Sequence, residues 1–175
     1  QEFEDVDIIL TQNPDNSNIG NEFKTNLADL DFAVETGKTF ILDDRWVNIP
    51  ESYLPGWEVG NGGEDAIRRG FNNDRNIDIV YEPLRYGRGG ALDDATLDNG
   101  TSSNHGYAFI DQLPDQAITL LDNGNDNQAV AFAYPFGQGT VVYSSIPIDY
   151  YFEGWGPANL KGGFQIYAAN LLGLI

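Results

Sequence analysis

A strand–helix–strand pattern near the N-terminus is the feature that most restricts the fold of this chain. Residues 6–11 (VDIILT) form a short apolar run, which is typical of a buried strand. A second apolar run follows at 39–42. Between the two runs, apolar residues recur every three or four positions, as on one face of a helix: Phe23, Leu27, Leu30 and Val34. Strands joined through a helix are parallel neighbours in a sheet, so the pattern predicts an α/β fold.

The rest of the chain extends this prediction. We expect a single α/β domain over residues 1–175, because this length suits one domain. Its sheet should be mostly parallel and flanked by helices, in a flavodoxin-like or amidotransferase-like arrangement with an antiparallel C-terminal hairpin at 129–146. The other expected elements are a short helix at 64–69, strands at 77–81 and 117–121, and a closing helix at 164–173.

The charge balance excludes several classes of partner. The chain has 27 acidic and 9 basic residues, a formal net charge of −18. Nucleic acids are bound mainly by lysine and arginine, so a nucleic-acid partner is not expected. No apolar run approaches the roughly 20 residues that span a bilayer, so no membrane span is expected.

Cysteine and methionine are both absent from the sequence. Without cysteine there is no thiolate nucleophile and no cysteine-based metal site. Since the first residue is Gln1, we expect a processed product or a piece of a longer chain. The acidic surface, which is tolerated where salt screens it, favours an extracellular or cell-surface location.

Two stretches resemble a known family. Residues 6–10 (VDIIL), 34–38 (VETGK) and 40–43 (FILD) follow the order of the class I glutamine-amidotransferase-like fold, in particular its ThuA-like branch. Residues 129–145 (AVAFAYPFGQGTVVYSS) are similar to the late hairpin of that branch. Amidotransferases of this fold carry a cysteine nucleophile after the strand that here ends at Leu42. Since cysteine is absent, the resemblance implies a noncatalytic accessory domain of a large secreted protein.

The candidate catalytic residues are two adjacent carboxylates and the only histidine. Asp43 and Asp44 follow an expected parallel strand, and ligands bind at the carboxyl ends of such strands. His105 lies in a loop rich in aspartate and serine and is a candidate general base. A triad of His105 and Asp43 with Ser102 or Ser103 lacks the G-x-S-x-G elbow that exposes a nucleophile. The alternative is that these polar groups only stabilise loops.

Aromatic residues next to charged ones suggest a site for sugar stacking. Residues 150–156 (YYFEGWG) form an aromatic cluster after the last strand. The candidate ligand-binding residues are Arg45, Trp46, Tyr150, Tyr151 and Trp155. Alternatively, the cluster packs under the closing helix as part of the core.

Oxygen-rich loops are candidate Ca²⁺ sites. Alternating aspartate and asparagine with glycine provide the oxygen ligands that Ca²⁺ prefers, although the same residues form ordinary turns. The candidate ligands are Asp93, Asp94, Asp98, Asp122 and Asp126. Residues 85–90 (RYGRGG) lack the ending of a phosphate-binding P-loop, so no nucleotide cofactor is expected.

The sequence thus favours a noncatalytic ligand-binding or interaction module of an extracellular protein. Its expected ligands are Ca²⁺, a carbohydrate or another extracellular protein. The first alternative is a hydrolase that acts on a carbohydrate or an ester through Asp43, Asp44 and His105. The second alternative is a structural spacer.

Overall fold

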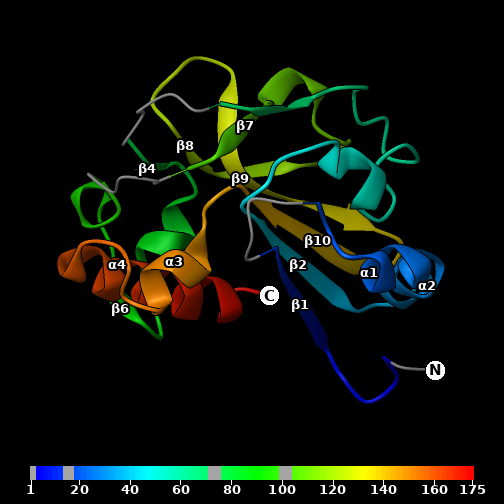
Figure 1. Ribbon diagram of the computed structural model, residues 1–175, viewed down its shortest axis with the longest axis horizontal. Coiled ribbons are helices and arrows are strands. Elements are labelled where there is room, and N and C mark those ends of the chain that lie inside the picture. The colour runs from blue at the N-terminus through cyan, green and yellow to red at the C-terminus, as the bar shows by residue number, and fades with distance from the viewer. Residues whose placement is uncertain (1–2, 14–17, 71–75, 99–103) are drawn as a thin grey trace.

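The computed structural model describes residues 3–13, 18–70, 76–98 and 104–175 (Figure 1). Its main sheet has eight strands, six of them in the order β1-β2-β10-β9-β7-β3, while β8 pairs with β9 and β4. Strands β5 and β6 form a separate small sheet. The strands are β1 (Ile8–Asn13), β2 (Thr39–Asp44), β3 (Ile67–Arg69), β4 (Asp78–Ile79), β5 (Tyr86–Gly87), β6 (Gly90–Ala91), β7 (Gly106–Phe109), β8 (Ile118–Asp122), β9 (Gln128–Phe136) and β10 (Gly139–Ser144).

Four α-helices accompany these strands in the described part of the chain. They are α1 (Asn21–Thr25), α2 (Leu27–Glu35), α3 (Ile148–Phe152) and α4 (Ala158–Leu172). The helix expected from the apolar face of Phe23, Leu27, Leu30 and Val34 is therefore confirmed as two short helices, and the closing helix expected at 164–173 is confirmed as part of α4. Within the described ranges, no helix is long and apolar enough to cross a membrane.

The prediction of a mostly parallel, flavodoxin-like or amidotransferase-like sheet is wrong. Among the described strands of the main sheet, only the β1–β2 and β2–β10 pairings are parallel, whereas five pairings are antiparallel. Parallel neighbours need a long crossover connection, which is usually a helix. In the described part of the chain only β1 and β2 are joined through α-helices, and the segment between β2 and α3 contains strands and 3-10 helices but no α-helix. The sheet is therefore mixed.

Two further expectations about the middle of the chain need correction. The short helix expected at 64–69 is instead strand β3, paired antiparallel with β7. The strand expected at 77–81 is shorter, since β4 spans only Asp78–Ile79. The strand expected at 117–121 corresponds to β8.

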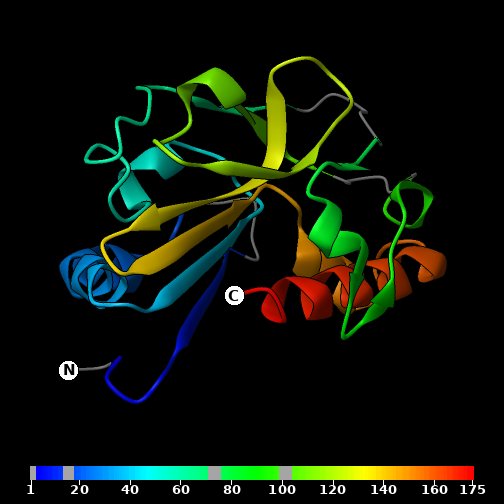
Figure 2. The same ribbon diagram turned by 180° about the vertical axis from the view of Figure 1, so that it is seen from behind.

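Helices cover the parallel half of the sheet on both faces (Figures 1 and 2). Side chains alternate across β2, so Phe40 and Leu42 pack in one core with α2, while Ile41 packs in the other core with α4. The first core also contains Trp57 and residues of β9 and β10, among them Phe132. This two-sided packing buries β2 almost completely.

The parallel strands end together, and their ends carry polar residues. In the strand register, Asn13 of β1 is opposite Asp44 of β2, and Asp43 is opposite Ser144 of β10. All four residues are buried. The carboxyl ends of β1, β2 and β10 are therefore the place where the fold gathers polar groups away from water.

Candidate functional site

Asp44 anchors the loop that follows β2. Its Oδ1 accepts hydrogen bonds from Asn13 Nδ2 at 3.1 Å and from the Trp46 amide at 2.9 Å. Its Oδ2 accepts from the Val47 amide at 3.1 Å and, more weakly, from the Tyr143 hydroxyl at 3.4 Å. Four donors around one buried carboxylate satisfy it fully, so its role is to hold the loop.

Asp43, the neighbouring carboxyl group, has a different environment. It is 7% exposed and lines a cavity of about 50 Å³ between the sheet and helices α3 and α4, whose other walls are mostly apolar. Burial raises the pKa of Asp43 to about 7; a hydrogen bond with the Ser144 side chain lowers it, and the negative charge of Asp149 raises it further. Asp43 therefore exchanges its proton near neutral pH.

Arg45 links the end of β2 to helix α3. Its Nη2 forms an ion pair with Asp149 Oδ2 at 2.8 Å, and both side chains are nearly buried. The guanidinium also lies over the ring of Tyr150, 5.7 Å from the ring centre. Arg45 thus holds a carboxylate and an aromatic ring in fixed positions beside Asp43.

His105 is buried in the same region, but its geometry differs from that of a catalytic base. Its Nδ1 lies 2.5 Å from the carbonyl oxygen of Arg45, and its amide donates to the carbonyl of Ser145 at 2.9 Å. A carbonyl only accepts, so Nδ1 carries the proton, whereas in a catalytic triad that proton is given to a carboxylate. Burial, together with the nearby Arg45 and Arg69, lowers the pKa of His105 despite this hydrogen bond.

Ser102 and Ser103, the serines considered as triad partners of His105, lie outside the described residues. Among the candidate catalytic residues, Asp43, Asp44 and His105 all lie near the same strand ends. Asp44 and the Nδ1 of His105 make hydrogen bonds that hold the structure together. Of these three candidates, Asp43 is therefore the one that can exchange a proton near neutral pH.

The aromatic cluster divides into an exposed and a buried part. Trp155 is 62% exposed, and its ring packs edge-on against Tyr150 at 6.3 Å. Tyr150 in turn contacts Tyr151 edge-on, and Tyr151 stacks on Phe164 of α4 at 4.2 Å. Tyr151 is fully buried, so it belongs to the core and is not available to a ligand. Trp155 and Tyr150 form a surface that we call the aromatic ledge.

Glycine and main-chain contacts fix the position of the ledge. The Trp155 amide donates to the Tyr150 carbonyl at 3.1 Å, which closes the turn. A Cβ atom at Gly156 would lie 2.7 Å from the Tyr151 ring and 3.0 Å from the Tyr150 ring. Only glycine lets the turn pack this closely on both tyrosines.

Trp46 has a neighbour that the sequence did not suggest. Arg69 of β3 lies 4.2 Å from the centre of the Trp46 indole and donates a hydrogen bond to the Trp46 carbonyl. Within the described residues, Trp46 Nε1, Arg45 Nε and Asn104 Nδ2 are buried donors without an acceptor. Buried donors are normally satisfied, so this concentration of unsatisfied N–H groups is unusual.

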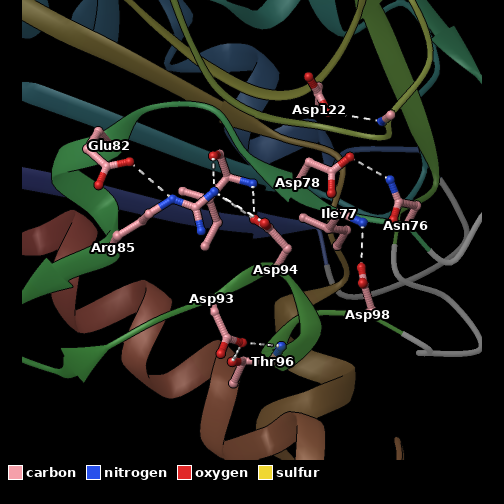
Figure 3. A network of polar contacts seen from close by, with 12 residues as sticks. Asn76, Ile77, Asp78, Glu82, Arg85, Asp93, Asp94, Thr96, Asp98 and Asp122 are labelled. Carbon is pink, nitrogen blue, oxygen red and sulfur yellow. Dashed lines mark hydrogen bonds and ion pairs between the residues drawn. The ribbon is translucent and has the colours of Figure 1, made fainter.

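The candidate calcium residues lie in a separate acidic region around β4, where the structure gives several of them main-chain partners (Figure 3). Asp98 Oδ1 accepts from the Ile77 amide at 2.8 Å, and Asp94 Oδ1 accepts from the Ile79 amide at 2.7 Å. Ile77 directly precedes β4 and Ile79 ends it, so the two carboxylates accept from main-chain amides where a neighbouring strand would otherwise pair.

The remaining acidic candidates also have local roles. Asp93 accepts from the Thr96 amide at 2.9 Å, and Asp122 from the Gly124 amide at 2.9 Å, while Asp126 is exposed in the turn before β9. Burial raises the pKa of Asp98 and of Asp122, and the nearby carboxylates add to both shifts. In the described part of the chain, no group of three or more acidic or histidine side chains has the geometry to hold a metal ion.

The calcium expectation therefore stays a prediction with a simple check. If Ca²⁺ relieves repulsion among these carboxylates, millimolar Ca²⁺ should raise the melting temperature more than NaCl of equal ionic strength, because a ligand of the folded state stabilises it. The measurement is a thermal melt with Ca²⁺ or with a chelator. Identical melting curves would show that these carboxylates do not bind Ca²⁺ and only form hydrogen bonds within the loops.

Several residues of the strand-end region escaped the sequence analysis: Asn13, Arg69, Ser144, Ser145 and Asp149. The signal for Ser144 was its place at the end of an apolar strand, 140–144, equivalent to the place of Asp43. Asp149 offered no comparable signal, since its role depends on α3 folding back towards Arg45.

Comparisons with known proteins bear on the fold alone. No protein-family model matches the chain, and no curated protein matches its sequence. The structure is similar to that of cytoplasmic protein STM3548 from Salmonella typhimurium, with a TM-score of 0.54 and 11% identity over 98% of this chain and 72% of that chain. A weaker likeness, with a TM-score of 0.40 and 13% identity, covers 93% of this chain and 21% of the β-galactosidase from Bacillus circulans sp. alkalophilus. The first likeness supports an α/β fold, and no family model supports the ThuA-like branch or an accessory-domain role.

Proposed function

We propose that this domain is a noncatalytic carbohydrate-binding module of an extracellular protein, and that its ligand stacks on the aromatic ledge. The observation that carries the proposal is Trp155, which is 62% exposed yet held in place by Tyr150. A large exposed aromatic ring is unfavourable in water, and rigid aromatic rings are frequent anchors of binding sites.

A nearly buried ion pair supports the ledge. The Arg45–Asp149 pair lies against Tyr150 and, with its two charges satisfied by each other, fixes that ring in position. The contacts from Trp155 through Tyr150 to the buried Tyr151 hold the ledge before a ligand arrives. A preorganised site loses less conformational entropy on binding.

The hydrolase alternative has less support. A glycosidase needs two carboxyl groups that flank the bond to be cleaved. Asp44 makes four hydrogen bonds within the protein, and Asp149 is paired with Arg45. This leaves Asp43 alone in its cavity, so the strand ends favour binding over hydrolysis.

The test is binding of a panel of soluble polysaccharides, measured by affinity electrophoresis and by isothermal titration calorimetry. We expect Trp155→Ala to weaken the binding at least about tenfold, because an anchoring aromatic residue contributes on the order of 2 kcal/mol. Tyr86→Ala is the matched control, since Tyr86 is 71% exposed but lies on β5, away from the ledge. Equal binding by Trp155→Ala and the unmodified domain, or binding of no polysaccharide, would contradict the proposal.

A further inference from the structure

Strand β1 has an open edge without the usual protection against pairing. It lies at the end of the strand order, and among the described residues no strand pairs with its outer side. Natural edge strands are commonly protected by lysine, proline, a bulge or a covering segment. The sequence of β1, IILTQN, contains neither a charged residue nor proline.

The outward-facing main-chain groups of β1 can be identified from one hydrogen bond. The Asp7 carbonyl accepts from the Thr39 amide, so Asp7 faces β2. Because main-chain direction alternates along a strand, the N–H and C=O groups of Ile8, Leu10 and Gln12 point to the open edge. They form a short template for one more strand.

Exposed apolar side chains lie along the same edge. Leu10 and Leu172 line the same cavity, and they are 55% and 46% exposed. Leu174 and Ile175, at 43% and 40% exposure, follow α4, whose C-terminal end lies near β1 in both views (Figures 1 and 2). Adjacent exposed apolar residues of this size mark interaction surfaces. We call Leu10, Leu172, Leu174 and Ile175 the edge patch.

The charges near the edge indicate the chemistry of the partner. Glu4, Asp5 and Asp7 are exposed just before β1. The one lysine at this end, Lys38, donates to the Glu4 carbonyl at 3.2 Å. A second copy of the chain would bring another net charge of −18 to the interface, which disfavours self-association.

We propose that β1 accepts an extended, lysine-containing segment of a basic partner protein as an additional strand. Main-chain hydrogen bonds to Ile8, Leu10 and Gln12 hold the segment, and its apolar side chains cover the edge patch. Lysine ammonium groups of the segment pair with the exposed carboxylates of Glu4, Asp5 and Asp7. This interface is separate from the aromatic ledge, so it does not depend on the proposed carbohydrate binding.

The first test uses a labelled synthetic peptide in which lysine alternates with valine, and measures binding by fluorescence anisotropy. Two peptides that are N-methylated at alternate residues keep the same side chains but block opposite edges of the peptide strand. We expect one of them to lose at least about tenfold in affinity, since each lost main-chain hydrogen bond contributes about 1 kcal/mol, while the other binds like the parent peptide. Equal affinity of the two would overturn the proposal without any change to the protein.

The second test changes the protein. Leu10→Lys places a charge on the edge and should weaken peptide binding about tenfold or more. Val59→Lys is the control, because Val59 is 78% exposed but lies beside Tyr53 and Trp57, in a loop that does not contact Leu10 or Glu4. Joint replacement of the exposed acids (Glu4→Gln, Asp5→Asn and Asp7→Asn) should abolish the preference for the lysine peptide over a peptide with norleucine in place of lysine. Equal binding of a glutamate–valine peptide, or a dimer in sedimentation that Leu10→Lys dissociates, would rule out a basic partner strand.

Discussion

Asp43→Asn is expected to stabilise the domain at pH 8 and to have little effect near pH 4. Asp43 has its pKa raised from 3.8 to about 7, chiefly by burial and also by the charge of Asp149. Ionising it within the fold is therefore unfavourable at pH 8. Asparagine keeps the shape and a hydrogen-bonding oxygen for Ser144 but carries no charge at any pH.

The direction of the effect follows from proton binding. Between about pH 4 and pH 7 the folded state keeps the proton that the unfolded state has released, so stability falls as the pH rises through this range. A pKa that is roughly three units higher corresponds to about 4 kcal/mol, an upper limit because water entry and relaxation reduce it. The variant lacks this decline, so its advantage over the unmodified domain should grow across the same range.

The measurement is urea denaturation of both proteins at a series of pH values from 4 to 9, with the free energy of unfolding from each curve. Removing one negative charge from a chain of net charge −18 reduces general repulsion as well. Asp126→Asn removes the same formal charge from an exposed turn and measures that general effect. If both variants follow the pH dependence of the unmodified domain, Asp43 is not the buried group that titrates near neutrality.

The parts of the fold that could be predicted from the sequence are those with long, regular patterns. The first βαβ unit has an apolar run, a helical face and a second apolar run. Each apolar run covers at least four residues and the helical face covers about three turns, so all three patterns can be recognised. The hairpin of β9 and β10 is indicated by two apolar runs around residues 135–139, of which only 137–138 form the turn in the structure. Strands β3 to β6 have two or three residues each, too few for an alternating pattern to be recognised.

The parallel sheet was wrongly predicted because strand direction depends on connections rather than on strand composition. The buried run 140–144 looks the same whether its neighbours are parallel or antiparallel. In the structure, β10 is parallel to β2 on one side and antiparallel to β9 on the other. A mixed strand of this kind is found only when all its partners are known.

The candidate site was predictable at the strand ends but not in its partners. Asp43 and Asp44 follow an apolar run directly, so their place was clear from the sequence. Their different environments were not, since these depend on Asn13 and Tyr143 around Asp44, and on Asp149 near Asp43. Each of those partners lies on another element of the fold. Replacing either of these two adjacent aspartates by asparagine is therefore expected to change the free energy of unfolding in opposite directions.

Asp44→Asn is expected to destabilise the domain by about 3 kcal/mol or more at neutral pH. The side chain of Asp44 accepts from Asn13, Tyr143 and the amides of Trp46 and Val47, and hydrogen bonds to a charged group contribute about 1.5–3 kcal/mol each. An asparagine in the same place has one oxygen, and its NH₂ group would face donors. At least one buried donor is then left without a partner, a mechanism known for large losses of stability.

Urea denaturation of Asp44→Asn at pH 7 checks this expectation, with Asp43→Asn as the matched control, because both variants change an adjacent buried carboxyl to the same amide. We expect opposite signs: Asp43→Asn gains stability relative to the unmodified domain and Asp44→Asn loses it. The loss should also loosen the loop after β2, so amide hydrogen exchange of Trp46 and Val47 should accelerate. Similar free energies of unfolding for the two variants would show that the four donors around Asp44 do not depend on its charge.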